Sequence, residues 1–211
     1  MANTFNPLGF DPGSRSDGAS WSGNLNGNYQ ILYSNTHQIF KGDPVTVLSS
    51  GYIDTLAPGS ISSTVMPCGI FWGCQYISAS QQKLVFMPYF PGSDTITNGI
   101  VTAFVIDDPS VSFWVQTGYS TSPGGAATQA MVGMNATYAY GTGSTSTGLS
   151  GAYIDLHTTP AVTAALPFRI MALPSDPWTG APGSNGLDNT TAFNLVLVNW
   201  NNQFQKQLTG V

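Results

Sequence analysis

Val111-Ser112-Phe113-Trp114-Val115-Gln116 is the stretch that decides the fold of this 211-residue chain. Its odd-numbered positions carry valine and phenylalanine, whereas serine, tryptophan and glutamine occupy the even ones. Successive side chains of a strand point to opposite faces, so this alternation predicts a strand with one buried face.

A second strand signal lies near the other end of the chain, at Phe193 to Trp200. From Phe193 to Val198 it is apolar on both faces, which predicts a strand that is either central in a sheet or covered by a partner chain. Eight short runs of this kind, bounded by turn residues, predict an antiparallel β-sandwich, a jelly roll or a β-barrel-like domain. The runs are Pro44 to Leu48, Ile70 to Ile77, Leu84 to Phe90, Ile100 to Ile106, Val111 to Gln116, Ala152 to Leu156, Phe168 to Leu173 and Phe193 to Trp200.

The composition favours the same all-β class. Only 7% of the residues are charged, and every acidic residue is aspartate, because the sequence contains no glutamate. Exposed helices usually take their solvent face from Glu, Lys and Arg, so this chain is poorly suited to them. Its 24 glycines and 14 prolines suit turns and long loops. A surface this poor in charge indicates a protein that is covered by partners.

Local patterns add more specific expectations. Asn98-Gly99 and Asp107-Asp108-Pro109 mark reversals, so residues 94–116 are expected to form adjacent antiparallel strands. Ala126 to Tyr140 has the one helical leaning in the sequence. Pro-Gly-Ser occurs four times and predicts type II turns. These tripeptides begin at Pro12, Pro58, Pro91 and Pro182.

Residues 1–30 differ from the rest, being rich in Asn, Gly, Ser and Asp without a sustained period. They are predicted to form an extended N-terminal arm, and residues 31–211 a β-rich domain with long Gly/Ser/Pro loops. Isolated apolar residues of the arm are the candidate anchors for a neighbouring subunit or partner. These candidates are Phe5, Leu8, Phe10, Trp21 and Tyr29. Removal of residues 1–25 is expected to leave a folded oligomer that no longer binds its partner.

Further features concern compartment and partners. Cys68 and Cys74 are predicted to be reduced core thiols, because one continuous strand would hold them about 20 Å apart. The first thirty residues lack a basic segment followed by an apolar run, so use without translocation is expected. No apolar run is long enough to span a bilayer, and a net charge of −5 argues against direct nucleic-acid binding.

The sequence offers few groups for catalysis. His37 and His157 are the available conventional bases, and both flank strand-like runs. Ser150 lacks the spacing of a nucleophile elbow and is interpreted as a turn serine. Asp107-Asp108 is interpreted as a turn before Pro109 rather than a calcium site, and Gly141 and Gly143 lack the lysine of a phosphate loop. No catalytic residue, cofactor site or metal site is predicted.

Several short segments together resemble the capsid cement, or head decoration, proteins of tailed bacteriophages. They occur in order along nearly the whole chain. The segments are Met1-Ala2-Asn3, Pro7-Leu8-Gly9-Phe10, Gly42-Asp43-Pro44-Val45, Gly69-Ile70-Phe71-Trp72-Gly73, Tyr89-Phe90-Pro91, Val105 to Phe113, the Gly141 to Gly151 loop with Ala152 to Leu156, Phe168-Arg169-Ile170 and Leu195 to Asn199. The region Ser175 to Asn189 is not matched and is treated as an insertion or tip loop.

This resemblance implies a β-rich protein made in the cytoplasm of a bacterial host and located on the outer surface of the virion. The implied partners are the major capsid protein and other copies of the chain, with a homotrimer preferred by analogy. The implied role is to cement junctions of the capsid against the internal pressure of the DNA. Neither a membrane nor direct contact with nucleic acid is implied.

Two alternatives belong to other classes. A carbohydrate-binding phage fibre or lectin-like module suits the aromatic and asparagine content. An enzyme would require His37 or His157 to lie in a pocket with a carboxylate.

Overall fold

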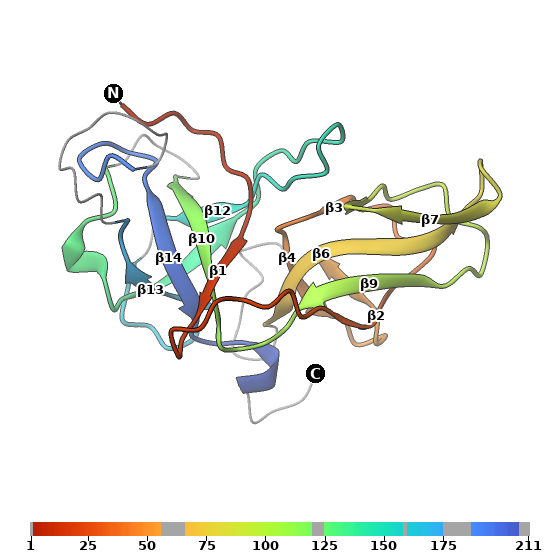
Figure 1. The fold of residues 1–211 in the computed structure, drawn as a ribbon, viewed down its shortest axis with the longest axis horizontal. Helices are drawn as coiled ribbons and strands as arrows, with labels where there is room; N and C mark the ends of the chain where they lie inside the picture. The colour runs from red at the N-terminus through yellow and green to blue at the C-terminus, as the bar shows by residue number, and fades with distance from the viewer. Residues whose placement is uncertain (1, 56–65, 120–124, 158–159, 175–186, 207–211) are drawn as a thin grey trace.

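The computed structural model describes residues 2–55, 66–119, 125–157, 160–174 and 187–206. Figure 1 shows two β lobes side by side, and the N-terminal residues belong to both. The described strands form two six-stranded sheets and a two-stranded ribbon, which confirms the all-β class. Each of the eight runs predicted from the sequence contains strand residues.

The first lobe, called the barrel lobe, is a sheet that closes on itself. Among the described residues its strands follow the order β10-β12-β11-β13-β14, and β14 pairs again with β10. Strand β1 adds to the outside of this ring by pairing with β10. The strands are β1 (Asp11–Arg15), β10 (Val111–Gly118), β11 (Asn135–Ala139), β12 (Tyr153–Asp155), β13 (Phe168–Ala172) and β14 (Leu195–Trp200). Strand β14 therefore lies between β10 and β13, and its two apolar faces are explained within the chain.

Aromatic rings fill the interior of the barrel lobe. Phe168 stacks on Phe10 and on Trp200, each with ring centroids 4.6 Å apart. Phe113 and Tyr138 contact the same group edge to face. Edge-to-face and offset-stacked rings add to the stabilisation from buried area, so this cluster forms the strongest part of the core.

The second lobe, called the open lobe, is built on the twelve-residue strand β6. Its sheet has the order β2-β9-β6-β4-β5, with β7 on the same edge of β6 as β4, and the ribbon β3-β8 completes the lobe. The core beneath is mainly aliphatic and includes Ile39, Val45 and Val105. The strands are β2 (Asn26–Ile31), β3 (Ile39–Phe40), β4 (Pro44–Val47), β5 (Ile53–Thr55), β6 (Pro67–Ser78), β7 (Lys83–Met87), β8 (Tyr89–Phe90) and β9 (Val101–Ile106).

Strand β6 connects the two cores. Ile70 is buried in the barrel core, whereas Phe71 is buried in the core of the open lobe. The register with β9 shifts between Phe71 and Gly73, so Trp72 is the extra residue of a bulge. Its ring packs against the barrel core, meets Trp21 edge to face at 5.5 Å and lies under the Lys41 ammonium group. Strand β6 therefore supplies neighbouring residues to both cores.

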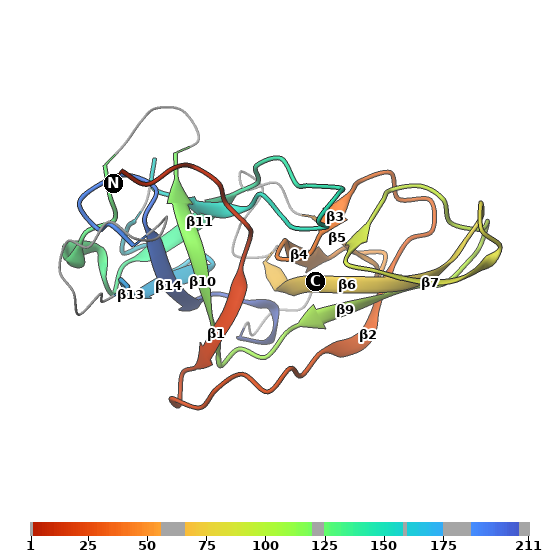
Figure 2. The ribbon, with the colours of Figure 1, turned by 45° about the horizontal axis from the view of Figure 1, so that its top comes forward.

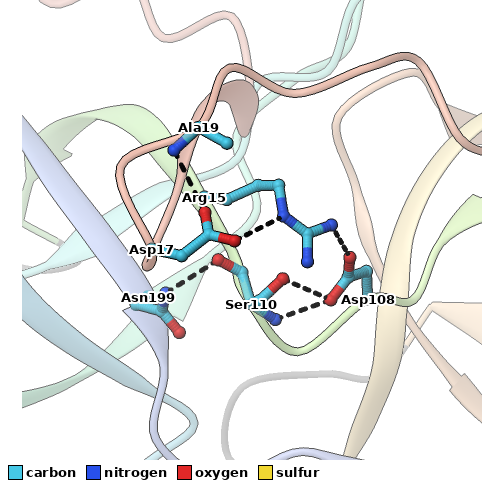
Figure 3. A network of polar contacts seen from close by, with 6 residues as sticks. All are labelled: Arg15, Asp17, Ala19, Asp108, Ser110 and Asn199. Carbon is cyan, nitrogen blue, oxygen red and sulfur yellow. Dashed lines mark hydrogen bonds and ion pairs between the residues drawn. The ribbon is translucent and has the colours of Figure 1, made fainter.

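The pairing expected for residues 94–116 is wrong. Strands β9 and β10 are consecutive but belong to different sheets. The turn between them is held by Asp108, which accepts hydrogen bonds from Ser110 and pairs with Arg15 at 2.6 Å (Figure 3). Burial acts to raise the pKa of Asp108, but these hydrogen bonds and the Arg15 guanidinium hold it below its ordinary value. Asp107-Asp108 is thus a crossover between lobes.

The helical leaning of residues 126–140 is also corrected. This region contains a short 3-10 turn, Gln129–Met131, followed by strand β11. Asn135 lies at the start of β11, where its backbone bonds Ala161 and its side chain accepts from Arg169. These long-range partners override a weak helical preference.

Smaller expectations have mixed outcomes. Cys68 and Cys74 are free and buried, as predicted. Gly92 has a positive φ, in keeping with a turn at Pro91. Pro12-Gly13-Ser14 instead lies inside β1. The tripeptides beginning at Pro58 and Pro182 lie outside the described residues, as does most of the region from Ser175 to Asn189.

Candidate interaction surfaces

The N-terminal segment is integrated into the fold. Strand β1 pairs with β10 and β2 pairs with β9, so a division at residue 30 falls inside a paired strand. Phe10 is 1% exposed and occupies the centre of the barrel core, which corrects its assignment as an interface anchor. Its burial among three aromatic rings is more favourable than exposure at a surface. Trp21 and Tyr29 are half-buried against the two cores.

Phe5 and Leu8 do lie on the surface. The Phe5 ring contacts Tyr153 and Phe193, each at 5.1 Å between centroids. Glycine at position 118 leaves room for the Phe5 ring, because a Cβ there would lie 2.6 Å from Tyr153 and 2.7 Å from Phe5. Leu8 is 56% exposed.

Leu8 borders a groove of about 510 Å³ between the N-terminal segment and the barrel. We call it the N-terminal groove. The buried Gln116 side chain positions its wall: it accepts from the Asn6 backbone N–H and donates to the carbonyl groups of Thr4 and Phe193, each at 2.9 Å. The lining is mostly apolar and consists of Asn6, Leu8, Gly9, Asp11, Trp114, Val115, Gln116, Leu149 and Leu195.

A second apolar surface lies on the open lobe. Strands β7, β6, β9 and β2 run side by side (Figure 2), and their register places Phe86, Gln75, Thr102 and Gln30 in one cross-strand row. Leu84 and Ile77 form the adjacent row. The opposite face of these strands covers the core through Tyr76, Val85 and Ala103 among others.

This outer face, called the apolar sheet face, is not covered by any other strand or loop that the structure describes. Phe86 is 67% exposed, and Ile100, at the start of β9, is 68% exposed. Leu84 and Ile77 are exposed as well. Contiguous exposed apolar residues of this kind mark interaction sites. This surface was not predicted from the sequence, although Leu84 to Met87 is apolar on both faces, as in Phe193 to Val198.

His37 lies in a cleft beside a carboxylate, which is part of what the enzyme alternative requires. Its Nδ1 lies 2.8 Å from a carboxylate oxygen of Asp54, and the ring lines an open cleft of about 510 Å³ with Asp43. Burial raises the pKa of Asp43 to about 6, although hydrogen bonds from Ser150 Oγ and the Phe40 N–H act in the opposite direction.

The candidate nucleophiles are engaged elsewhere. Ser150 is buried, donates to Asp43 at 2.5 Å and accepts from the Ala152 N–H, so it joins the two lobes. Burial raises the pKa of both cysteine thiols, for Cys74 to about 12, which keeps them protonated. Among the described residues, the hydroxyl groups that line this cleft with His37 belong to Thr36, Thr55 and Tyr140, and neither Ser150 nor a cysteine is part of the lining.

The remaining motifs have structural roles. Asp107 accepts from Asn26, Tyr29 and Gln205. Gly143 lies against the Phe40 ring, where a Cβ would come within 2.3 Å. Over the residues that the structure describes, no three His, Cys or Asp side chains gather as metal ligands, and no helix is long and apolar enough to cross a membrane.

Comparison of the chain with protein-family models, curated proteins and solved structures finds no match. The resemblance to phage cement proteins therefore stays a prediction from the sequence.

Proposed function

We propose that this chain is a structural virion protein that binds the outer surface of a phage capsid and cements the junctions between major capsid proteins. The observation that carries the proposal is the pair of uncovered apolar surfaces on different lobes: the N-terminal groove on the barrel and the apolar sheet face on the open lobe. A cement protein must bind the capsid and also other copies of itself, and this chain has one exposed apolar surface for each of these contacts.

The N-terminal groove is assigned to the capsid. Leu8, Leu149 and Leu195 offer an apolar lining, and Gln116 holds the segment that forms one wall. A preformed groove binds with a smaller loss of conformational entropy than a free arm does. The contact is thus made by a rigid surface rather than by a flexible tail.

Cementing follows from thermodynamic linkage. A protein that binds only the assembled lattice stabilises that lattice by mass action. Several binding sites in one homo-oligomer raise the effective concentration of each further contact. A low surface charge limits repulsion when many copies cover the same shell.

The test is co-sedimentation with purified undecorated capsids. Because Phe10 and β1 belong to the barrel, deletion of residues 1–25 would damage the fold, and a point substitution replaces it. Leu8→Asp is expected to weaken binding at least about tenfold by placing a carboxylate in the groove. Val162→Asp, at a residue that is 90% exposed on the same lobe, is the matched control and should bind like the wild type.

Wild-type protein that stays in the supernatant would overturn the proposal. A glycan array would then test the carbohydrate-binding alternative, in which the wild type binds a defined sugar and the capsid plays no part.

A further inference from the structure

We propose that a second copy of this chain covers the apolar sheet face, with the same face of each copy packed against the other. The inference rests on the self-association that the proposed function includes, and it is independent of capsid binding.

The charge of the face is compatible with a second copy. The chain carries a net charge of −5, so two copies repel least where a face carries no carboxylate. The rows Phe86–Gln75–Thr102–Gln30 and Leu84–Ile77 contain no charged residue. Lys83 pairs with Ser78, whose side chain lies on the core side of the sheet. Two copies can therefore meet at this face without like charges opposite one another.

The polar groups of the face are self-complementary. Gln75 and Gln30 each carry an amide that both donates and accepts, and the Thr102 hydroxyl does the same. Because each of these groups can either donate or accept, an identical face supplies partners for them in any relative orientation of the two copies. The apolar side chains Phe86, Leu84 and Ile77 supply the area that leaves water.

The geometry suits sheet-on-sheet packing. Two sheets stack about 10 Å apart with their strands roughly aligned. The end of the β6–β7 hairpin projects away from the barrel lobe, so the barrel leaves this end open to a partner (Figures 1 and 2). The resulting pair would be a β-sandwich whose two layers come from different copies.

The size of the face sets the strength of the contact. Four strands about 4.8 Å apart and roughly six residues long cover a flat area of about 300–400 Å². Two copies therefore bury about 600–800 Å² in total, less than the roughly 1,000 Å² of a stable specific interface, so the contact is a weak and reversible one. We expect a dimer that forms reversibly at micromolar or higher concentration, and that is favoured when capsid binding concentrates the copies.

Sedimentation velocity over a series of protein concentrations tests the inference. The wild type is expected to shift reversibly from monomer to dimer. Phe86→Asp places a carboxylate among the exposed apolar side chains of the face on both copies and is expected to weaken association at least about tenfold. Ile100→Asp, at the edge of the same face, should act in the same direction, and Val162→Asp should associate like the wild type.

Several outcomes would overturn the inference: a wild type that stays monomeric at every concentration, Phe86→Asp and Ile100→Asp proteins that associate like the wild type, or a trimer that neither change affects. Capsid pelleting of the same variants separates this failure from failure of the proposed function. Phe86→Asp protein should still bind capsids through the N-terminal groove, because its groove residues are unchanged.

Discussion

The barrel lobe and the open lobe bury the apolar side chains of their sheets in different ways. In the barrel, β14 returns to β10, so each apolar side chain on the inner face meets another strand across the ring. In the open lobe, β6 carries neighbours on both sides, but beyond Ile70 and Ile106, which pack into the barrel core, only one face of the sheet has a core beneath it. The outer face is left with Phe86 and Ile100 in solvent.

This difference teaches where stability and interaction reside. Closure of a sheet removes free edges and converts nearly all inward area into core. An open sheet keeps an uncovered face and unpaired edges, which are available to partners. The barrel is therefore expected to contribute most of the stability, and the open lobe the self-association.

Substitution of matched phenylalanines gives the largest expected effect. Phe168→Ala removes a fully buried ring stacked on two others and should lower the free energy of unfolding by about 3–5 kcal/mol. Phe86→Ala should change it by less than about 0.5 kcal/mol. Urea unfolding measures both, and equal effects would break the contrast between the lobes.

The second prediction concerns the N-terminal segment. Phe10→Ala should lower the free energy of unfolding by about 3 kcal/mol, because the ring lies inside the barrel core. Leu8→Ala, two residues away and exposed, is the control and should have little effect. A stable Phe10→Ala protein would show that the segment is not part of the barrel.

The third prediction uses the raised pKa of Asp43, which lies where the lobes meet. A folded pKa of about 6, above the unfolded value, means that protonation favours the folded state. The contribution is present at acidic pH and is lost as the pH rises through about 6. Wild-type protein should therefore lose about 2 kcal/mol of stability between about pH 4 and about pH 7 relative to Asp43→Asn. Urea unfolding at both pH values measures this change. An equal change in the free energy of unfolding for the wild type and for Asp43→Asn would contradict the raised pKa of Asp43.

The smallest effect is expected at the crossover between the lobes. Asp108→Asn removes a partly exposed ion pair with Arg15 and should cost about 0.5–1 kcal/mol at low salt, and less at high salt. Because the folded pKa of Asp108 is lowered, its contribution is present at neutral pH and is lost as the pH falls below about 4. An effect independent of salt would rule out the electrostatic explanation.

Particular residues show how far the sequence could lead. The alternation in Val111–Gln116 and the doubly apolar Phe193–Val198 identified strands, and burial of the two cysteines was predicted correctly. The pairing of β9 with β6 and β2, rather than with β10, could not be predicted, because a turn at Asp107–Asp108 fits a hairpin and a crossover equally well. Among the candidate surface residues, Phe5 and Leu8 are exposed, and Phe10 is not.

The sequence by itself determined the strand content, the lack of long helices in the described part of the chain and the small number of charged residues, because these depend on local periodicity and composition. Only the tertiary structure decided that Phe10 is core, that Trp72 is directed towards the barrel by a bulge, and that Phe86 remains in solvent. The physical reason is that an apolar side chain looks the same in sequence whether its face is covered or not. Coverage depends on which distant strands pair and on whether the sheet closes.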